Sequence, residues 1–308
     1  MLRLRRAAVA AVALVLSVLG AACEAESAST RTTTTTAAAE AAAPVVVLAV
    51  GDIADCTKSE DEAVAQLVDA MRGPVLLLGD IAYPNGTPEQ FDTCFAPAWG
   101  RYRERLRPAP GNHEYGTKDA AGYFGWFGDA AGKRGKGWYS FDVGDWHLIA
   151  LNSNCALVGG CGAGSEQERW LRDDLAGAKA RCTAAFWHHA RFSSGGTHGS
   201  DPATGDLWRA LADAGAEVVL VGHEHNYERF APLDPAGRVD PERGIRQFVV
   251  GTGGRSHYGF GVPREGSEVR DSTSFGLLEL RLRADGYSWR FVPVASATFT
   301  DEGEGRCR

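Results

Sequence analysis

Apolar runs and segments with helical spacing alternate along the first two thirds of the chain. Residues 45–50 and 75–78 are continuous apolar runs, which is typical of strands buried on both faces of a sheet. Between these runs, residues 60–71 carry apolar side chains at intervals of three and four, which predicts a helix. Residues 88–106 are also predicted to be helical, with an interruption at Pro97.

Strands become dominant toward the C-terminus. A hairpin of residues 138–143 and 146–151 is predicted, and Ser165 with Glu168 forms the pattern of a capping box at the start of a helix. Residues 207–214 have the spacing of a further helix. The remaining apolar runs predict strands at residues 183–187, 217–221, 247–250, 277–282 and 287–294. This order of elements predicts an α/β protein in which two packed sheets are flanked by helices.

Residues 1–22 have the organisation of a secretory signal peptide. Arginines at the start of this segment precede a short apolar run, and small residues follow it. A transmembrane helix is the alternative, but the run is shorter than the roughly 20 residues that a span requires. Residues 23–43 are largely Ala, Thr, Ser and Glu and are expected to form a disordered tether. The folded domain is therefore predicted at residues 44–308.

Cysteine usage fits export. Of the seven cysteines, Cys23 directly follows small residues, where a bacterial lipoprotein carries its lipidated cysteine. The pattern is imperfect because Leu19 lies four residues before Cys23 and not three, and a free thiol after ordinary cleavage is the alternative. We expect an extracellular or cell-surface protein whose only membrane contact is a possible lipid on Cys23. The other six cysteines suffice for three disulfides in an oxidising compartment.

The charge balance excludes one class of partner. The chain has 32 Lys and Arg against 39 Asp and Glu, a net charge of −7. Removal of residues 1–22 takes away three arginines and no acid, which makes −10. Because phosphate backbones are bound by clustered basic residues, no nucleic-acid binding is expected.

The sets of residues that can bind metals each lie just past the end of a predicted buried strand. In α/β sheets the carboxyl ends of the strands line the ligand crevice, so these side chains are expected to lie together. Glycine precedes most of the sets and lets the backbone turn sharply. The sets are Asp52, Asp80 with Tyr83, Asn112 with His113, His188 with His189, and His223 with His225.

The positions of the six cysteines relative to these strand-end motifs suggest a disulfide pairing. Cys56 and Cys94 each follow one of the first two strand-end motifs, so both are expected near one rim. Cys155 and Cys161 bracket a short glycine-rich loop, which leaves Cys182 to pair with Cys307. This is one of fifteen possible pairings.

The order GD … GDxxY … GNHE … H … GHxH resembles that of the calcineurin-like metallophosphoesterases. The segment Gly79-Asp80-Ile81-Ala82-Tyr83 is similar to the purple acid phosphatase branch. The resemblance extends from about Val45 to at least Gly254. It implies a four-layer α/β/β/α sandwich of two mixed sheets with flanking helices.

The resemblance also implies two metal ions, iron with a second divalent ion such as zinc, manganese or iron. Asp80 would bridge them, as a carboxylate between two close cations does. Carboxylate, amide, imidazole and phenolate donors suit iron, manganese and zinc. The first ion would be held by Asp52, Asp80, Tyr83 and His225, and the second by Asp80, Asn112, His188 and His223.

Two departures from the family pattern bear on these ligands. Relatives outside the purple branch have a histidine ligand where this chain has Ala54, so Tyr83 is interpreted as its replacement. A packed aromatic is the alternative for Tyr83. At the histidine pair, the family has one ligand that is typically followed two residues later by proline, where this chain has Ala190. His188 is interpreted as the ligand because it directly follows a predicted strand. His189 is then expected to lie behind the ligands or to face the substrate.

Hydrolysis of phosphate monoesters by a metal-bound hydroxide is the implied reaction. His113 would contact phosphate or protonate the leaving group. His198 and Arg191 could reach the same phosphate, and a solvated loop is the alternative for both. The other functions considered are a phosphodiesterase acting on nucleotides or phospholipids and a non-catalytic surface binding protein on the same fold. The Gly251–Gly254 segment is not followed by a helix pattern, so it is expected to allow close packing below the metals and not to bind a dinucleotide.

Overall fold

The computed structural model describes residue 13 and residues 43–308. The predicted signal peptide, the tether and Cys23 lie outside the described residues, apart from residues 13 and 43. None of the described helices is both long and apolar enough to cross a membrane.

The first sheet has six strands in the order β15-β14-β13-β1-β3-β5. Its strands β1, β3 and β5 run parallel, whereas β13, β14 and β15 pair in antiparallel fashion. The strands are β1 (Val45–Val50), β3 (Val75–Leu78), β5 (Leu106–Ala109), β13 (Gly276–Arg283), β14 (Gly286–Pro293) and β15 (Glu302–Arg306).

The second sheet has seven strands in the order β12-β10-β11-β9-β8-β7-β6. The four central strands β11, β9, β8 and β7 run parallel to one another. Antiparallel strands lie at both edges, with β10 and β12 on one side and β6 on the other. The strands are β6 (Tyr139–Val143), β7 (Trp146–Ala150), β8 (Cys182–Phe186), β9 (Val218–Val221), β10 (Tyr227–Phe230), β11 (Arg246–Val250) and β12 (Ser267–Asp271). A two-stranded ribbon joins β2 (Ala54–Asp55) to β4 (Ala82–Tyr83).

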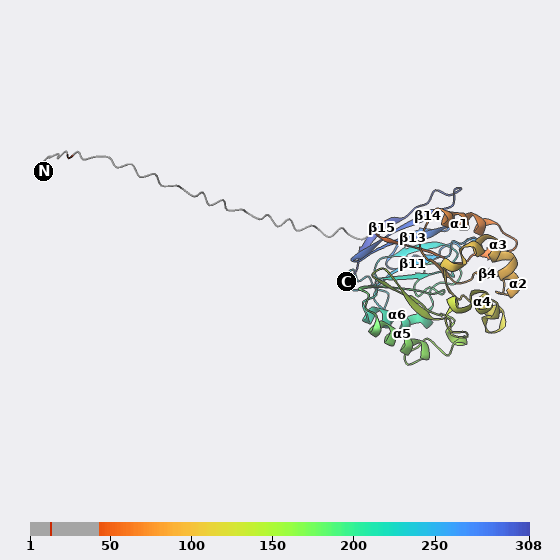
Figure 1. Ribbon diagram of the computed structural model, residues 1–308, viewed down its shortest axis with the longest axis horizontal. Coiled ribbons are helices and arrows are strands. Elements are labelled where there is room, and N and C mark those ends of the chain that lie inside the picture. The colour runs from red at the N-terminus through yellow and green to blue at the C-terminus, as the bar shows by residue number, and fades with distance from the viewer. Residues whose placement is uncertain (1–12, 14–42) are drawn as a thin grey trace. The chain divides into compact units, whose positions relative to one another are not determined.

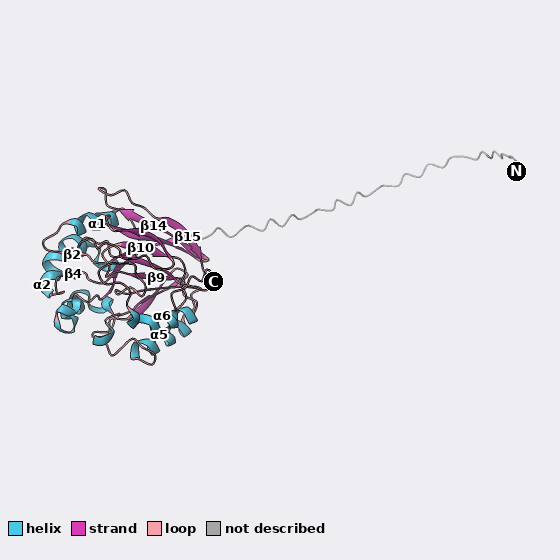
Figure 2. Ribbon diagram, turned by 180° about the vertical axis from the view of Figure 1, so that it is seen from behind, coloured by secondary structure: helices cyan, strands magenta, loops and turns pink. Residues whose placement is uncertain are grey.

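Three buried clusters separate four layers. One lies between the first sheet and the helices α1, α3 and α4, one between the two sheets, and one between the second sheet and α5 with α6. Figures 1 and 2 show the helices outside the strands. The predicted α/β architecture of two mixed sheets with flanking helices is confirmed. The helices are α1 (Glu60–Asp69), α2 (Pro88–Gln90), α3 (Ala96–Trp99), α4 (Ala121–Phe127), α5 (Glu166–Gly177) and α6 (Gly205–Asp213).

The segment predicted as one helix over residues 88–106 is more irregular than expected. A π-helical turn at Phe91–Phe95 separates α2 from α3, and a 3₁₀ segment at Gly100–Arg105 follows. Pro97 has no N–H for the carbonyl four residues earlier, which disfavours a regular helix through this point. Leu106 then begins β5, a strand that the sequence did not indicate. Its Pro108 is tolerated because β5 is at the edge of the sheet.

The predicted capping box at α5 forms only in part. The Ser165 hydroxyl accepts a hydrogen bond from the Glu168 N–H at 3.2 Å, as expected. The Glu168 carboxylate, however, accepts from Gly164 N at 3.0 Å, one residue before the N-cap. A complete capping box is instead present at α2, where Thr87 and Gln90 satisfy each other's backbone N–H groups.

All three predicted disulfides are confirmed: Cys56–Cys94, Cys155–Cys161 and Cys182–Cys307. The first links the turn after β2 to the π-helical turn. The last links the start of β8 in the second sheet to the residue after β15 in the first. Three disulfides indicate an extracytoplasmic location.

Asp61 predicts a pH dependence of stability. It is buried in the first turn of α1, and its Oδ2 has no hydrogen-bond partner among the described residues. Burial, with a smaller contribution from Glu62, raises the pKa of Asp61 from 3.8 to about 7. The folded protein therefore retains a proton that the unfolded chain releases near pH 4, so this group lowers stability as the pH rises from about 4 to 7.

We expect Asp61→Asn to raise the free energy of unfolding at pH 8 by roughly 1–3 kcal/mol, since the ionised carboxylate no longer has to be buried. At pH 4 the difference should be small. Urea unfolding at the two pH values measures this, and Glu89→Gln, an exposed acid in the first turn of α2, is the matched control. An equal effect of Asp61→Asn at both pH values would contradict the assignment.

Candidate metal centre

The carboxyl ends of the parallel strands of both sheets meet at one edge. Asp52 follows β1, Asp80 follows β3, and Asn112 follows β5. From the second sheet, His188 follows β8, and His223 and His225 follow β9. The strand-end interpretation is therefore confirmed for the positions of these residues.

Glycines permit the two sheets to approach at this edge. A Cβ on Gly79 would lie 2.6 Å from His188 Nδ1, and one on Gly222 would lie 2.6 Å from Asp52 Oδ2. Gly251, in the glycine-rich segment after β11, would place a Cβ 2.7 Å from Asp52 Oδ2. The expectation that this segment allows close packing is confirmed.

Three of the clustered residues have a left-handed backbone that non-glycine residues rarely adopt. The φ angles are 61° at Asp52, 50° at Asp80 and 73° at His223. Such conformations cost of order 1–3 kcal/mol each and persist where the surrounding structure enforces them. Their occurrence at three convergent polar residues identifies this edge as the candidate functional site.

The first group consists of Asp52, Asp80, Tyr83 and His225. The Tyr83 hydroxyl lies 3.0 Å from Asp52 Oδ1, 3.1 Å from Asp80 Oδ2 and 3.2 Å from His225 Nε2. His225 Nε2 is 3.3 Å from Asp52 Oδ1. Donor atoms at these separations can be bound by one ion at the usual 2.0–2.2 Å.

The second group consists of Asp80, Asn112, His188 and His223. His188 Nε2 is 3.2 Å from Asp80 Oδ2, 3.1 Å from Asn112 Oδ1 and 3.1 Å from His223 Nδ1. The oxygen Oδ2 of Asp80 therefore contacts both groups. Its other oxygen accepts a hydrogen bond from His113 N at 2.8 Å, which fixes the carboxylate between them.

The charges and donor atoms of this cluster favour the binding of cations. Burial, followed by the carboxylates of Asp52 and Asp80, raises the pKa of Tyr83 well above its usual value. Burial opposes charge on His188, yet the Asp80 carboxylate raises the pKa of His188 to about 9. The buried space holds carboxylates, a phenol and imidazoles close together. Such a set of groups is stabilised by bound positive ions. The residues thus form a buried metal-binding cluster that fits a dinuclear centre.

Glu114 supports the loops that carry this cluster. Its buried carboxylate accepts hydrogen bonds from Asp80 N at 2.9 Å, Ile81 N at 2.8 Å and Gly111 N at 2.7 Å. Burial, followed by the charge of Asp80, raises the pKa of Glu114 to about 7. The GNHE motif therefore also contains the residue that ties the loop after β3 to the loop after β5.

The three predicted catalytic residues have different locations. His113 is partly exposed, with Nε2 3.7 Å from Asp80 Oδ2 and Nδ1 donating to the Pro84 carbonyl at 2.5 Å. His198 stacks on His223 with ring centroids 4.1 Å apart. Arg191 lies over the ring of Phe192, and no hydrogen bond or ring contact joins it to either group within residues 43–308.

The segment after β11 supplies site residues that the sequence analysis missed. Tyr258 stacks on His225 at 4.0 Å, and Ser256 Oγ lies 2.6 Å from His225 Nδ1. Arg255 lies over the Tyr83 ring. The available signal was that this segment follows another parallel strand, the same signal that identified the other sets.

Glu224, between two of the clustered histidines, was also missed. Its buried carboxylate accepts hydrogen bonds from His198 N at 2.7 Å and from Gly199 N. It thereby connects the loop after β9 to the loop that carries His198. Nothing in the spacing of the motif indicated this contact.

Comparisons with known proteins agree with this geometry. Residues 37–227 match the family described as calcineurin-like phosphoesterase. The chain is 30% identical to the Mycobacterium tuberculosis protein Rv2577, over 59% of this chain and 42% of that protein. It is 29% identical to purple acid phosphatase 21 of Arabidopsis thaliana, over 54% of this chain and 39% of the other. The chain thus spans less than half of the length of these curated relatives.

A solved structure shows the same fold. The purple acid phosphatase PPD1 from yellow lupin seeds matches with a TM-score of 0.72, over 84% of this chain and 53% of the lupin chain. Sequence identity is 20%, so this likeness bears on the fold alone. The family match covers more than half of the sequence. The protein therefore belongs to the calcineurin-like phosphoesterases, and it is similar to purple acid phosphatases.

Proposed function

We propose that this protein hydrolyses phosphate monoesters with two metal ions, one in each group defined above. The observation that carries the proposal is the position of Asp80 Oδ2, 3.1 Å from the Tyr83 hydroxyl in the first group and 3.2 Å from His188 Nε2 in the second. A carboxylate oxygen between two donor sets is suited to bridge two cations. The name of the Arabidopsis relative supports a phosphatase.

We assign iron to the first group, with a divalent ion such as zinc, manganese or iron in the second. The phenol of Tyr83 supports this choice, because an anionic oxygen donor stabilises a trivalent ion. When bound, the two ions would supply Lewis-acid stabilisation of the phosphoryl oxygens and lower the pKa of a water molecule.

The residues beside the two groups position the ester. The Pro84 carbonyl holds the Nδ1 proton of His113, so His113 Nε2 faces the cluster. An imidazolium in this orientation can donate its Nε2 proton to the leaving oxygen. We assign to His198, which stacks on His223, the role of contacting a phosphoryl oxygen. We assign no role to Arg191, because its guanidinium packs on Phe192.

Metal analysis combined with two substrates tests the proposal. The purified protein should contain two metal equivalents and hydrolyse an aryl phosphate faster than an aryl phosphodiester. Chelation should remove activity, and readdition of metal should restore it. Faster hydrolysis of the diester would favour a phosphodiesterase. Two bound metals without hydrolysis of either ester would refute the enzymatic assignment and favour a binding protein.

Glu224 gives a more specific prediction. Glu224→Ala removes the acceptor of two backbone N–H groups in the His198 loop, and an unpaired buried donor costs about 1–3 kcal/mol. We expect kcat/KM for the aryl phosphate to fall roughly tenfold or more. Glu224→Gln keeps an acceptor oxygen and should lose less.

A double-mutant comparison separates positioning from general damage. If Glu224 acts by placing His198, Glu224→Ala should have little further effect in the His198→Ala background. Metal content should remain at the wild-type level in both variants. Fully additive losses would show that Glu224 does not act through His198.

A further inference from the structure

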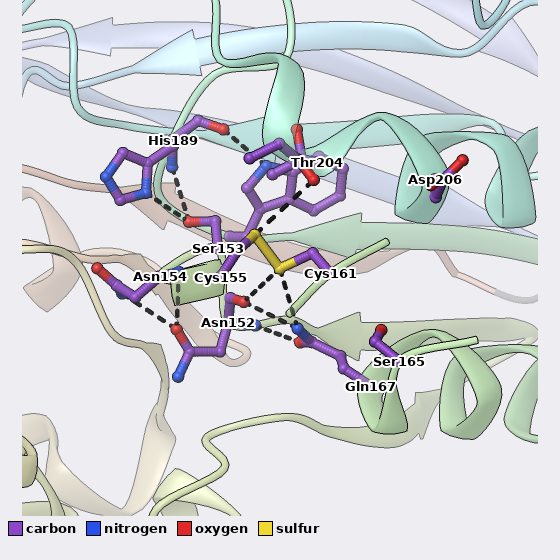
Figure 3. Close-up of a disulfide and its surroundings, with 12 residues drawn as sticks. Asn152, Ser153, Asn154, Cys155, Cys161, Ser165, Gln167, His189, Thr204 and Asp206 are labelled. Atoms are coloured by element: carbon purple, nitrogen blue, oxygen red, sulfur yellow. Dashed lines mark hydrogen bonds between the residues drawn. A yellow bond between two sulfur atoms is a disulfide. The ribbon is translucent and has the colours of Figure 1, made fainter. Parts of the chain in front are cut away.

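His189 makes contacts that place it beside the second group. Its Nδ1 is 2.8 Å from Ser153 Oγ, and its backbone N donates to the same oxygen at 3.0 Å. Figure 3 shows Ser153 held against the histidine in this way, with the other ring nitrogen, Nε2, pointing away from Ser153. The ring centroid lies 4.4 Å from that of His223 and 5.0 Å from that of His188.

The orientation of His189 matches that of two proposed ligands. His188 Nδ1 donates to the Leu78 carbonyl at 2.8 Å, which leaves Nε2 facing Asp80. His225 Nδ1 lies 2.6 Å from Ser256 Oγ, which leaves Nε2 facing Asp52. Metal-binding histidines almost always have such a partner on the other ring nitrogen, because it fixes the tautomer and the ring orientation. Ser153 Oγ therefore lies against Nδ1 of His189 in the same way that Ser256 Oγ lies against Nδ1 of His225.

The hydrogen-bonding capacity of Ser153 is consistent with this role. A serine oxygen has two lone pairs, so it can accept from both the backbone N and the Nδ1–H of His189. The imidazole then keeps its free lone pair on Nε2. One ring nitrogen from each of His188, His189 and His223 lies within 4.8 Å of the other two. Small side-chain movements would bring three nitrogens to one ion with bonds of 2.0–2.1 Å.

Ser153 lies in a loop that a disulfide and side-chain hydrogen bonds hold in place. The disulfide Cys155–Cys161 closes the segment that follows it. Before it, Asn152 N donates to Gln167 Oε1 at 2.7 Å. After it, Asn154 Nδ2 donates to the Pro110 carbonyl at 3.1 Å, next to the loop of Asn112. Figure 3 shows the disulfide and these polar side chains together. The loop therefore fixes Ser153 relative to the second group.

We propose that His189, oriented by Ser153, is an additional ligand of the metal in the second group, which rests on the two-metal function proposed above. The second ion then has three imidazole donors besides Asp80 and Asn112, whereas the first has a phenolate and one imidazole. Imidazole-rich sites suit zinc and similar divalent ions. The two positions therefore differ in the metal that each prefers.

Zinc titration of the metal-depleted protein against a chromophoric chelator tests the proposal. His189→Gln and Ser153→Ala should each weaken one zinc equivalent roughly 10- to 100-fold and leave the other unchanged. Ser153→Thr retains the hydroxyl and should restore binding. The matched control is Ser256→Ala, which removes the equivalent hydroxyl from His225 and should weaken the other equivalent.

The remaining outcomes overturn the inference. Unchanged zinc affinity in folded His189→Gln, with a raised KM for the aryl phosphate, would show that His189 contacts substrate and not metal. Unchanged affinity and unchanged kinetics would show a packing role. Because the titration uses zinc alone, it is independent of catalysis. A wild-type protein that binds two zinc ions but hydrolyses neither ester would refute the proposed function and leave this test intact.

Discussion

Replacement of Asp80 by asparagine is expected to abolish turnover and to lower metal content at both positions. Its Oδ2 contacts donors of both groups, so one substitution removes the negative charge shared by two cations. Activity on an aryl phosphate should fall roughly a thousandfold or more, since loss of a single electrostatic donor in a hydrolase site already costs about a hundred- to a thousandfold. Elemental analysis and steady-state kinetics of the purified variant measure the two effects.

The asparagine variant preserves most of the local structure. Its amide oxygen can still accept the hydrogen bond from His113 N, and Glu114 still holds the Asp80 backbone N–H. A matched control is Asp69→Asn, which changes an exposed acid on α1 by the same atoms. That control should keep both metals and full activity. If Asp80→Asn retained two metals and a near-normal rate, Asp80 would not be the bridge.

Replacement of Tyr83 by phenylalanine is expected to remove a colour. If the phenolate binds ferric iron in the first group, the iron-loaded protein should absorb visible light through charge transfer from phenolate to iron, which neither Asp nor His produces. Tyr83→Phe removes this oxygen and keeps the buried ring. The variant should fold, lose the band and hold the first metal less tightly. Activity should fall as well, because Ala54 offers no substitute ligand.

Absorption spectra, metal analysis and rates of the two proteins compare these expectations directly. Tyr287→Phe, which changes a buried tyrosine in the core between the sheets, controls for the loss of a phenol as such. It should keep the band. An unchanged spectrum, metal content and rate in folded Tyr83→Phe would mean that Tyr83 is only a packed aromatic.

The architecture and the convergence of the polar residues could be read from the sequence because both depend on local patterns. Buried parallel strands such as Val75–Leu78 are continuous apolar runs, and the polar residue after each run must lie at the carboxyl edge of the sheet. The six cysteines could be paired because two of them follow strand-end motifs expected at one rim and two bracket a short loop, which leaves the last two for each other.

Other features depend on contacts that a one-dimensional pattern does not contain. Strand β5 has only one large apolar residue, and its place in the sheet depends on pairing with β3. The hydrogen bond of Glu224 to the His198 loop and that of Ser153 to His189 join segments distant in the chain. Tyr258 reaches His225 only because the turn after β11 folds back over the site.

Strand β8 is fastened at both of its ends. At the start of β8, the disulfide Cys182–Cys307 joins the strand to the residue that follows β15 in the opposite sheet. Beyond the end of β8, His188 contacts Asp80, which follows β3 of that same opposite sheet. Metal ions bound at the His188 end of β8 would link the two sheets through coordination bonds, whereas the disulfide links them covalently at the Cys182 end. Each ion present at a hundred times its Kd would add about 2.7 kcal/mol to the stability of the closed sandwich. Loss of metal should therefore loosen the layers first at the edge that holds the metal-binding cluster. Amide hydrogen exchange should increase after β3 and β8, while the edge at Cys182 stays protected.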